Sequence, residues 1–340
     1  MRIRLAVMVA MVVLLALIGL ALSACDGQEE NKKNESGGTA STNVPAHATF
    51  HGTNGRIAYA LDKGSGAQIY TINPDGTGQR QLTHVDGDVV SLDWSPNGRE
   101  IVFELDHPDH CSVVVMNADG TQMRDLTGTG HPCDSTPAFM PGGDRVVFMA
   151  EGGSGPIMSM NLRGGDRRVI YRSQLYKKEP QVSPDGKRVL FLVEKDLPDR
   201  QGFDDNVKAL YSVRMNGTDL KTVVPFDFDV CACGGYWAPN GERIAFSNNA
   251  GAADEPPTLP TNLATIRPDG TDLRFLTHFQ DINAYHSIGS YSPDGRWILF
   301  KAASDDTYKL WKIHPDGTNK TLIATFKFNF FTRVWGPRPT

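Results

Sequence analysis

The chain has 340 residues, of which 40% are hydrophobic and 21% are charged, a composition typical of globular proteins. Its 34 Lys and Arg against 39 Asp and Glu give a net charge of −5, which argues against nucleic-acid binding because that function needs a basic surface. The 34 Gly and 21 Pro predict many turns and disfavour a helical bundle.

An apolar N-terminal run predicts a signal peptide over residues 1–24. Two arginines within the first four residues precede an uncharged segment, 5–24, that is mostly Leu, Val, Met and Ala. The sequence LSAC at 22–25 then resembles the bacterial lipobox. This resemblance implies cleavage before Cys25 and transfer of a diacylglyceryl group to its thiol. The alternative is an uncleaved helix, since a run of this length would also span a bilayer.

Residues 25–50 are predicted to form a flexible tether. They are rich in Asn, Ser, Gly, Thr, Glu and Lys and contain almost no large apolar side chain, so they cannot bury enough surface to order themselves. A coil of ~25 residues reaches about 25–30 Å from end to end. We therefore expect a lipid on Cys25 to anchor a folded domain, residues 51–340, at the cell envelope and outside the cytoplasm.

The rest of the sequence repeats one turn motif. An aromatic or apolar residue precedes a turn in which Pro is followed two residues later by Gly, and an apolar run comes next. Pro presets φ and the Gly supplies a left-handed position, so each copy predicts a tight hairpin between two strands. The copies are WSPNG at 94–98, FMPGG at 139–143, VSPDG at 182–186, WAPNG at 237–241 and YSPDG at 291–295.

A second turn, usually Asp-Gly, follows each first one, so each unit is expected to contain four strands. The first-turn glycines recur every 43 to 55 residues, at positions 55, 98, 143, 186, 241 and 295, which is close to the spacing of propeller blades. The first unit lacks the WSP before its glycine, and the sequence VWGP at 334–337 supplies it. We therefore expect the C-terminal strand to close a ring of six blades and leave no open sheet edge.

The complete repeat resembles the WD40-like PD40 repeat of TolB-family propellers. The shared pattern is Trp-Ser-Pro-Asp-Gly, then Ile-x-Phe, then an alternating strand that ends in Asp-Gly and often leads to Leu-Thr, over roughly residues 52–337. The resemblance implies an all-β fold, a six-bladed propeller of four-stranded blades. TolB itself also has an N-terminal α/β domain, and this chain has only the tether in that place.

Two long loops on one end of the propeller are the first candidate binding site. The fourth and fifth units are longer than the others, and their extra residues fall between the second and third strands, at 194–206 and 248–259. Insertions clustered on one face are where propellers bind, although neutral drift in loop length is the alternative. Only Lys195 and Arg200 oppose the acidic side chains there. The predicted acidic rim, for a basic protein or a divalent cation, is Glu194, Asp196, Asp199, Asp204, Asp205, Asp254 and Glu255, with Phe203 and Leu259 as apolar anchors.

The cysteines predict one disulfide, and they leave the state of a second pair open. An exported chain can keep disulfides. Cys111 begins a third strand and Cys133 lies in the connection to the next blade, on the same end of the ring, so we predict a bridge between them. Cys231 and Cys233 are separated by one residue and could form a strained bridge, remain two free thiols or bind a metal. The bridge is slightly favoured.

Metal and funnel sites are weaker candidates. No spacing among His107, His110, Cys111, His131, Cys133 and Asp134 matches a ligand template, so no metal site and no cofactor is predicted. The centre of the ring could instead hold a small ligand. The residues expected to line this funnel are Asp134, Lys178, Glu179, Tyr285 and His286.

The sequence therefore predicts an envelope lipoprotein whose propeller is a protein-binding or scaffolding module for unidentified envelope proteins, and not an enzyme. The alternative is a tethered carbohydrate-binding protein, or a metal-assisted polysaccharide lyase or hydrolase that uses the funnel. Some six-bladed propeller lyases cleave acidic sugars with a metal and a cluster of funnel histidines. Here the funnel is expected to supply only His286.

Overall fold

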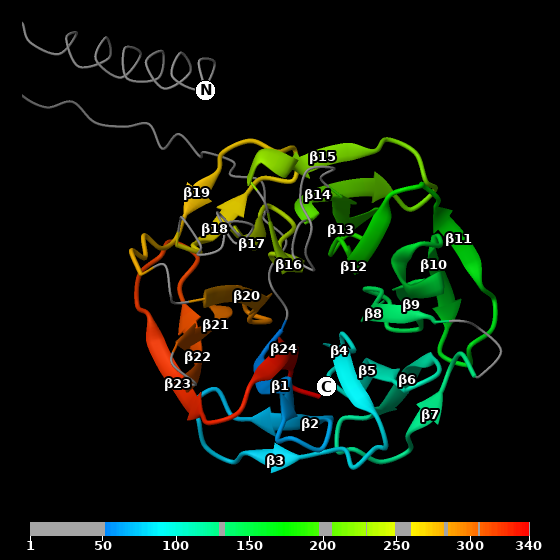
Figure 1. Ribbon diagram of the computed structural model, residues 1–340, viewed down its shortest axis with the longest axis horizontal. Helices are drawn as coiled ribbons and strands as arrows, with labels where there is room; N and C mark the ends of the chain where they lie inside the picture. The colour runs from blue at the N-terminus through cyan, green and yellow to red at the C-terminus, as the bar shows by residue number, and fades with distance from the viewer. Residues whose placement is uncertain are drawn as a thin grey trace, which may run out of the picture. The chain divides into compact units, whose positions relative to one another are not determined.

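The computed structural model describes residues 52–128, 133–196, 206–228, 230–248, 260–281, 285–304 and 307–339. These residues form six four-stranded antiparallel sheets that stand around a central axis like the blades of a propeller (Figure 1). The all-β, six-bladed fold predicted from the repeats is confirmed. The predicted signal peptide and tether, and most of both long loops, lie outside the described residues.

Each blade contributes one strand to each of four concentric layers. The innermost strands are β4 (Asp88–Trp94), β8 (Ser135–Phe139), β12 (Tyr176–Val182), β16 (Val230–Trp237), β20 (Tyr285–Tyr291) and β24 (Phe330–Pro337). The second strands are β5 (Glu100–Asp106), β9 (Arg145–Met149), β13 (Arg188–Asp196), β17 (Ile244–Asn248), β21 (Ile298–Ser304) and β1 (Asn54–Asp62).

The outer layers are shorter. The third strands are β6 (Cys111–Asn117), β10 (Ile157–Asn161), β14 (Asn206–Arg214), β18 (Leu263–Ile266), β22 (Thr307–Ile313) and β2 (Ala67–Ile72). The outermost strands are β7 (Arg124–Asp125), β11 (Arg168–Tyr171), β15 (Lys221–Val224), β19 (Arg274–Phe275), β23 (Thr321–Phe326) and β3 (Arg80–Gln81). Two short 3₁₀ helices, η1 (Glu151–Gly153) and η2 (Phe226–Phe228), complete the described structure. Neither helix has the length and apolar character that crossing a bilayer requires.

The C-terminal strand closes the ring, as predicted. Strand β24 pairs antiparallel with β1, so that Val334 lies opposite Ala58 and Trp335 opposite Ile57. Trp335 is buried, and its indole N–H donates to the Gly55 carbonyl at 3.2 Å. The first blade is thus built from both ends of the described chain, which removes the free sheet edges that an open ring would expose.

The turn motif found in the sequence forms a repeated hydrogen-bonded unit. The Ser95 hydroxyl accepts from the Glu100 backbone N–H at 2.8 Å, and Ser183 and Ser292 accept in the same way in their blades. The glycine of the turn has positive φ, for example +68° at Gly98, a region that side chains disfavour. These turns, together with the turns between third and fourth strands, lie on one end of the disc, which we call the turn face.

Aromatic side chains of the second strands fill the spaces between blades. Phe103, Phe148, Phe191, Phe246 and Phe300 come from the Ile-x-Phe runs of the repeat, and each is at most 1% exposed. They belong to separate hydrophobic clusters between successive blades. The repeat therefore encodes the core as one large apolar side chain per blade interface.

Candidate functional site

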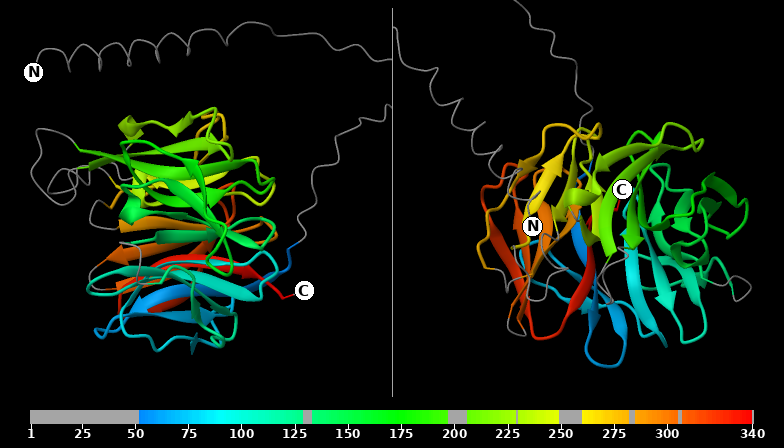
Figure 2. Two further views of the ribbon diagram at one scale, coloured as in Figure 1. Left: turned by 90° about the vertical axis from the view of Figure 1, so that its right-hand side faces the viewer. Right: turned by 45° about the horizontal axis from the view of Figure 1, so that its top comes forward.

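The innermost strands bring a ring of exposed apolar side chains to one end of the central channel. All six innermost strands begin at the end of the disc opposite the turn face, which we call the loop face; the left view of Figure 2 shows the C-terminus on the turn-face side. Near these starts, Val90 is 42% exposed, Phe331 40%, Tyr176 38% and Tyr285 38%. We call these four side chains the funnel mouth.

Two lysines lie beside the aromatic side chains of the funnel mouth. The Lys301 ammonium, on β21, donates to the Asn329 side-chain oxygen at 3.1 Å and lies 5.7 Å from the Tyr285 ring centre and 5.8 Å from that of Phe331. Burial lowers the pKa of Lys301 to about 8. On the other side, Lys178 lies 5.0 Å from the Tyr176 ring centre. The mouth thus combines apolar area with positive charge.

Carboxyl groups with raised pKa values lie deeper in the channel. Every innermost strand shifts register against its second strand. Such bulges re-aim side chains. At one of them Glu179 has a φ of +51°. Desolvation, reinforced by the charge of Glu104, raises the pKa of Glu179 to about 8. Desolvation likewise raises the pKa of Asp93 to about 7, although the Phe139 N–H donates to it at 2.8 Å.

The acidic rim predicted from the sequence is only partly described. Glu194 is 9% exposed and its carboxylate pairs with the Lys178 ammonium at 3.3 Å, so it does not present free charge to a partner. The backbone of Asp196 ends β13. The remaining predicted members, Asp199, Phe203, Asp204, Asp205, Asp254, Glu255 and Leu259, lie outside the described residues.

Two predicted funnel residues face elsewhere. His286 is 6% exposed and stacks on Phe279 of the fifth blade, with ring centres 3.7 Å apart, because alternate residues of β20 point to opposite sides. Asp134 is 2% exposed and forms an ion pair with Arg167. Both side chains are buried, so neither presents an exposed group to a ligand in the funnel. Tyr285, Lys178 and Glu179 do lie around it.

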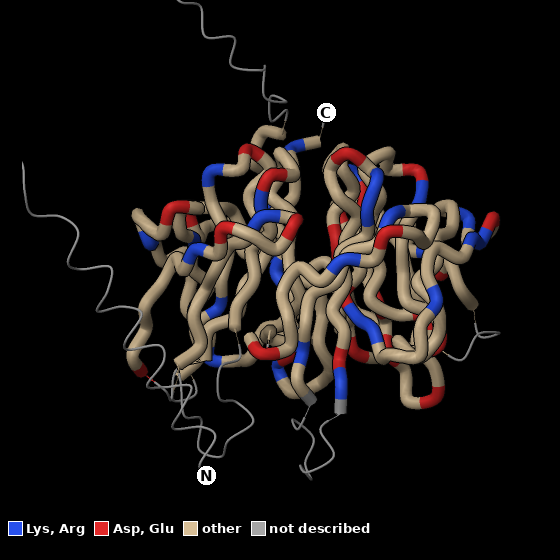
Figure 3. Tube along the Cα trace, turned by 90° about the horizontal axis from the view of Figure 1, so that it is seen from above, with Lys and Arg blue, Asp and Glu red and all other residues tan. Residues whose placement is uncertain are grey.

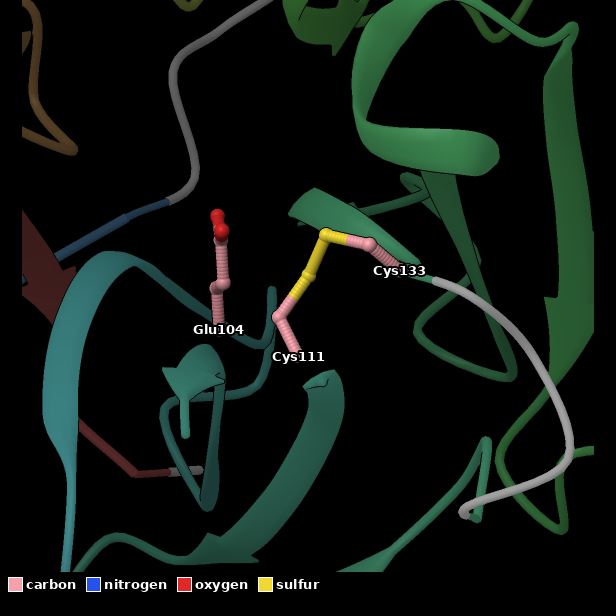
Figure 4. A group of neighbouring side chains, drawn as sticks. All are labelled: Glu104, Cys111 and Cys133. Atoms are coloured by element: carbon pink, nitrogen blue, oxygen red, sulfur yellow. A yellow bond between two sulfur atoms is a disulfide. The ribbon is translucent and has the colours of Figure 1, made fainter. Parts of the chain in front are cut away.

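The predicted disulfide is present, and it occupies two of the candidate metal ligands. Cys111 and Cys133 are bonded to each other, and the Glu104 carboxylate lies beside them (Figure 4). Sulfurs joined in a disulfide do not act as thiolate ligands. His110 contacts the Asp109 carboxylate at 2.7 Å and stacks on His107, while His131 lies outside the described residues.

The slight preference for a bridge between Cys231 and Cys233 was wrong. The structure has both as thiols, with the sulfur atoms 2.9 Å apart. They lie on the first part of β16 at the funnel. The Cys231 sulfur is 2.7 Å from the Tyr285 hydroxyl, and the Cys233 sulfur is 3.4 Å from the Ser247 hydroxyl.

Sequence reasoning missed several residues of this site, among them Glu104, Tyr176, Lys301, Phe331 and Arg333. A usable signal was present for the strand positions. Counting back from the Pro of each turn motif places Tyr176 in register with Tyr285 and with Cys231. Lys301 and Glu104 lie on second strands and carry no comparable pattern.

A groove lies on the opposite end of the molecule. It has a volume of about 770 Å³ and runs between the first two blades on the turn face, where Arg56, Arg80, Asp75 and Asp119 line it. Charged residues of both signs are interspersed along this face (Figure 3). The arginines already donate to the protein, for example Arg80 to the Asp119 carbonyl at 3.1 Å, so the groove offers little unused hydrogen-bonding capacity.

Most of the chain matches one protein family. The model described as PD40, TolB beta propeller domain, matches residues 30–202 and 132–339. The chain belongs to the PD40 family. This PD40 chain is 24% identical over 293 residues to the Tol-Pal system protein TolB of Bordetella pertussis, an alignment that covers 83% of this chain and 60% of that protein. The chain spans between 43% and 60% of the length of the curated relatives it matches.

Solved structures show the same fold at low sequence identity. TolB from Acinetobacter baumannii matches this PD40 propeller with a TM-score of 0.65 and 18% identity, over 86% of this chain and 68% of that one. An oligogalacturonate lyase in complex with manganese matches with a TM-score of 0.54 and 12% identity, over 81% of this chain and 74% of that one. At these identities the matches establish the propeller architecture.

Proposed function

We propose that this PD40 propeller is a membrane-anchored envelope lipoprotein that binds a protein partner at the funnel mouth. The supporting observation is the convergence of Val90, Tyr176, Tyr285 and Phe331 around one end of the channel. Soluble proteins seldom keep exposed apolar side chains together unless something binds there. Exposed aromatic residues at the centre of a polar surface are also the usual anatomy of a protein interface.

Support for the envelope setting comes from the N-terminal sequence and from the relatives. Residues 1–24 read as a signal peptide, 25–50 as a tether and 51–340 as the propeller, with Cys25 as the lipidated residue. A matched relative is named as a protein of the Tol-Pal system. A tethered propeller with an apolar mouth fits a scaffold that holds an envelope protein near the membrane.

The partner interface can be tested with site-specific photo-crosslinking in native membranes. A benzoylphenylalanine at position 331 or 176 should give a discrete adduct, whereas the same group at Leu322 on the outermost strand β23, which is 45% exposed, should give none. The substitution Phe331→Asp should remove the Tyr176 adduct without lowering the melting temperature. Equal adducts at all three positions, or none at the mouth, would contradict a protein interface there.

A carbohydrate-binding module, or a metal-assisted lyase or hydrolase, is the second candidate. The exposed rings of Tyr176 and Tyr285, each near a lysine, favour it because aromatic faces and cations suit acidic sugars. Among the innermost strands as described, His286 is the single histidine, and it is buried against Phe279. Binding and turnover of polygalacturonate, measured with and without Mn²⁺, would distinguish this candidate from the protein interface.

A further inference from the structure

The two thiols at the funnel are arranged as a reactive pair. Cys231 and Cys233 are alternate residues of β16, so their side chains leave the strand on the same side. Their sulfur atoms are 2.9 Å apart. Cys231 is 1% exposed, lying under the Tyr285 hydroxyl, while Cys233 is partly exposed. Cys233 therefore keeps some exposed surface on the innermost strand, whereas Cys231 has almost none.

The surroundings stabilise a thiolate. Hydrogen bonds from Cys233 and then Tyr285 outweigh burial and hold the pKa of Cys231 at about 6. Burial and the neighbouring Cys231 sulfur raise the pKa of Cys233 well above its usual value, although the positive charge of Arg333 opposes this shift. The Arg333 guanidinium donates to the Ser287 hydroxyl at 2.7 Å, and its buried Nε has no partner among the described residues. The pair shares its remaining proton between the two sulfurs, and thiolates near cations and hydroxyl donors are the reactive form of cysteine.

We propose that Cys231 and Cys233 form a redox-active dithiol that undergoes thiol–disulfide exchange with small disulfides entering through the funnel mouth. The proposal does not depend on the protein partner. The substrate class is a small disulfide because both cysteines lie on the innermost strand β16, and Tyr285 covers Cys231, so that a folded protein cannot bring its own disulfide to them. The lysine and arginine beside the pair favour an acidic disulfide such as oxidised glutathione.

The exchange takes place in two steps. The proton of Cys233 first passes to the Cys231 thiolate across the 2.9 Å between the two sulfur atoms. The Cys233 thiolate then attacks one sulfur of the disulfide, the reagent's S–S bond breaks, and a mixed disulfide forms while one thiolate leaves and takes the proton from Cys231. The Cys231 thiolate then attacks the Cys233 sulfur, forms the Cys231–Cys233 bond and releases the second thiolate. Two electrons pass from the protein to the reagent. The proton of the pair ends on one released thiol, and the other released thiolate takes its proton from water.

The geometry favours this chemistry over metal binding. Two thiolates on one tetrahedral zinc ion, each about 2.3 Å from the metal, lie roughly 3.8 Å apart. The observed 2.9 Å is shorter than that spacing, and the cations Arg333 and Lys301 would repel a metal ion. In the Cys111–Cys133 pair, by contrast, both sulfurs are already bonded to each other.

The test follows one peptide of the full-length protein. Trypsin cleavage after Lys221 and Arg243 isolates residues 222–243, which contain Cys231 and Cys233 and no other cysteine. After treatment of the folded protein with oxidised glutathione and rapid alkylation, this peptide should be lighter than its reduced form by two hydrogen atoms and carry no alkyl group. A peptide that stays fully alkylated would overturn the proposal, as would zinc retained stoichiometrically by the purified protein.

Three variants assign the roles of the two sulfurs. Cys231→Ser should stop at a glutathione mixed disulfide on Cys233, because the resolving thiol is missing. Cys233→Ser should react many-fold more slowly, because Cys231 is buried. Tyr285→Phe keeps both thiols and should slow the exchange several-fold, which provides a readout even if a cysteine variant fails to fold. Equal reactivity of both single-cysteine variants would contradict the assigned order of attack.

Discussion

At the ring axis, two carboxyl groups of the second blade hold the innermost strand of the third. Asp93 accepts from the Phe139 N–H at 2.8 Å, and Glu104 accepts from the Thr136 N–H at 2.9 Å and from the Ser91 hydroxyl. Burial raises the pKa of both groups. Contacts between blades at the axis are thus made by ionisable groups in a poorly hydrated channel, and this makes the stability of the ring sensitive to pH.

The raised pKa values predict that stability falls as pH rises from about 4 to about 8. Asp93, with a pKa of about 7, and Glu179, with a pKa of about 8, keep their protons in the folded protein after the unfolded chain has released them. The folded state then binds more protons, so raising the pH favours unfolding. Asp93→Asn should make the stability less dependent on pH. One such group changes the free energy of unfolding by at most about 4 kcal/mol over this pH range.

Urea denaturation at several pH values measures this effect. Asp86→Asn is the matched control, because this exposed residue lies on the loop before β4. Its profile should parallel that of the unmodified protein. If Asp93→Asn retains the full loss of stability between pH 5 and pH 8, the Asp93 carboxyl is not its cause.

At the residue scale, the cysteines and His286 show which features the sequence could predict and which it could not. The pairing of Cys111 with Cys133 was predictable because both positions could be assigned to the same end of the ring. The side of the strand that His286 faces was not, because each innermost strand contains a bulge and a shift of one residue reverses which side chains face the channel. Whether Cys231 and Cys233 are bonded depends on side-chain geometry that spacing alone does not fix.

Among the elements, an arginine latch recurs on the turn face. Arg243, at the start of β17, donates to the Thr265 hydroxyl at 2.9 Å, to the Asp272 carboxylate at 2.8 Å and to the Asp272 carbonyl at 2.6 Å. Arg145 and Arg188 make equivalent contacts in their blades. The latch ties the second strand to the turn that follows the third, and it holds the aspartate at positive φ, +54° at Asp272.

Removing one latch should destabilise its blade. Arg243→Ala eliminates charge-assisted hydrogen bonds that are partly shielded from water, so we expect the melting temperature to fall by a few degrees. Arg274→Ala is the matched control, since Arg274 contacts the same carboxylate but is 62% exposed. Similar losses for the two variants, measured by calorimetry, would show that the latch adds nothing beyond a surface ion pair.

Closure of the ring depends on one buried indole. Trp335→Ala leaves a cavity beside Tyr59 and Ile72 in the cluster between the first and last blades, and it removes the hydrogen bond to the Gly55 carbonyl. The expected loss is about 3–5 kcal/mol, a large part of a typical stability of about 5–15 kcal/mol. Phe328→Ala, at a position 46% exposed, should cost little. An unchanged denaturation midpoint for Trp335→Ala would mean that other contacts close the ring.

Blade number, strand order and ring closure were all predictable, and the reason lies in the turns. The Pro-x-Gly and Asp-Gly turns have backbone requirements that few residues satisfy, so they mark strand ends directly in the sequence. The arginine latch was missed because its members are separated in sequence and each looks like an ordinary surface charge. Three side chains of the funnel mouth, Val90, Tyr176 and Phe331, were missed for a similar reason, since they come from different blades.

For the whole molecule, the two ends of the described chain lie together on the turn face. The Arg338 N–H donates to the Thr53 carbonyl at 2.8 Å, and Gly52 lies against Pro293 of a turn motif. The first described residue therefore lies on the turn face. The funnel mouth and the thiol pair open on the loop face, at the opposite end.

The anchor itself is tested at Cys25. Only a thiol accepts the diacylglyceryl group, so Cys25→Ser should abolish incorporation of a palmitate analogue, leave the signal peptide uncleaved and shift the molecular mass accordingly. Cys231→Ser should retain full labelling, which shows that the label reports on Cys25 and not on a reactive thiol of the propeller. The propeller should keep its melting temperature in both variants if their substitutions leave its packing intact. A Cys25→Ser protein that still incorporates the lipid and fractionates as a processed membrane protein would refute the lipobox interpretation, and with it the membrane anchoring of the proposed scaffold.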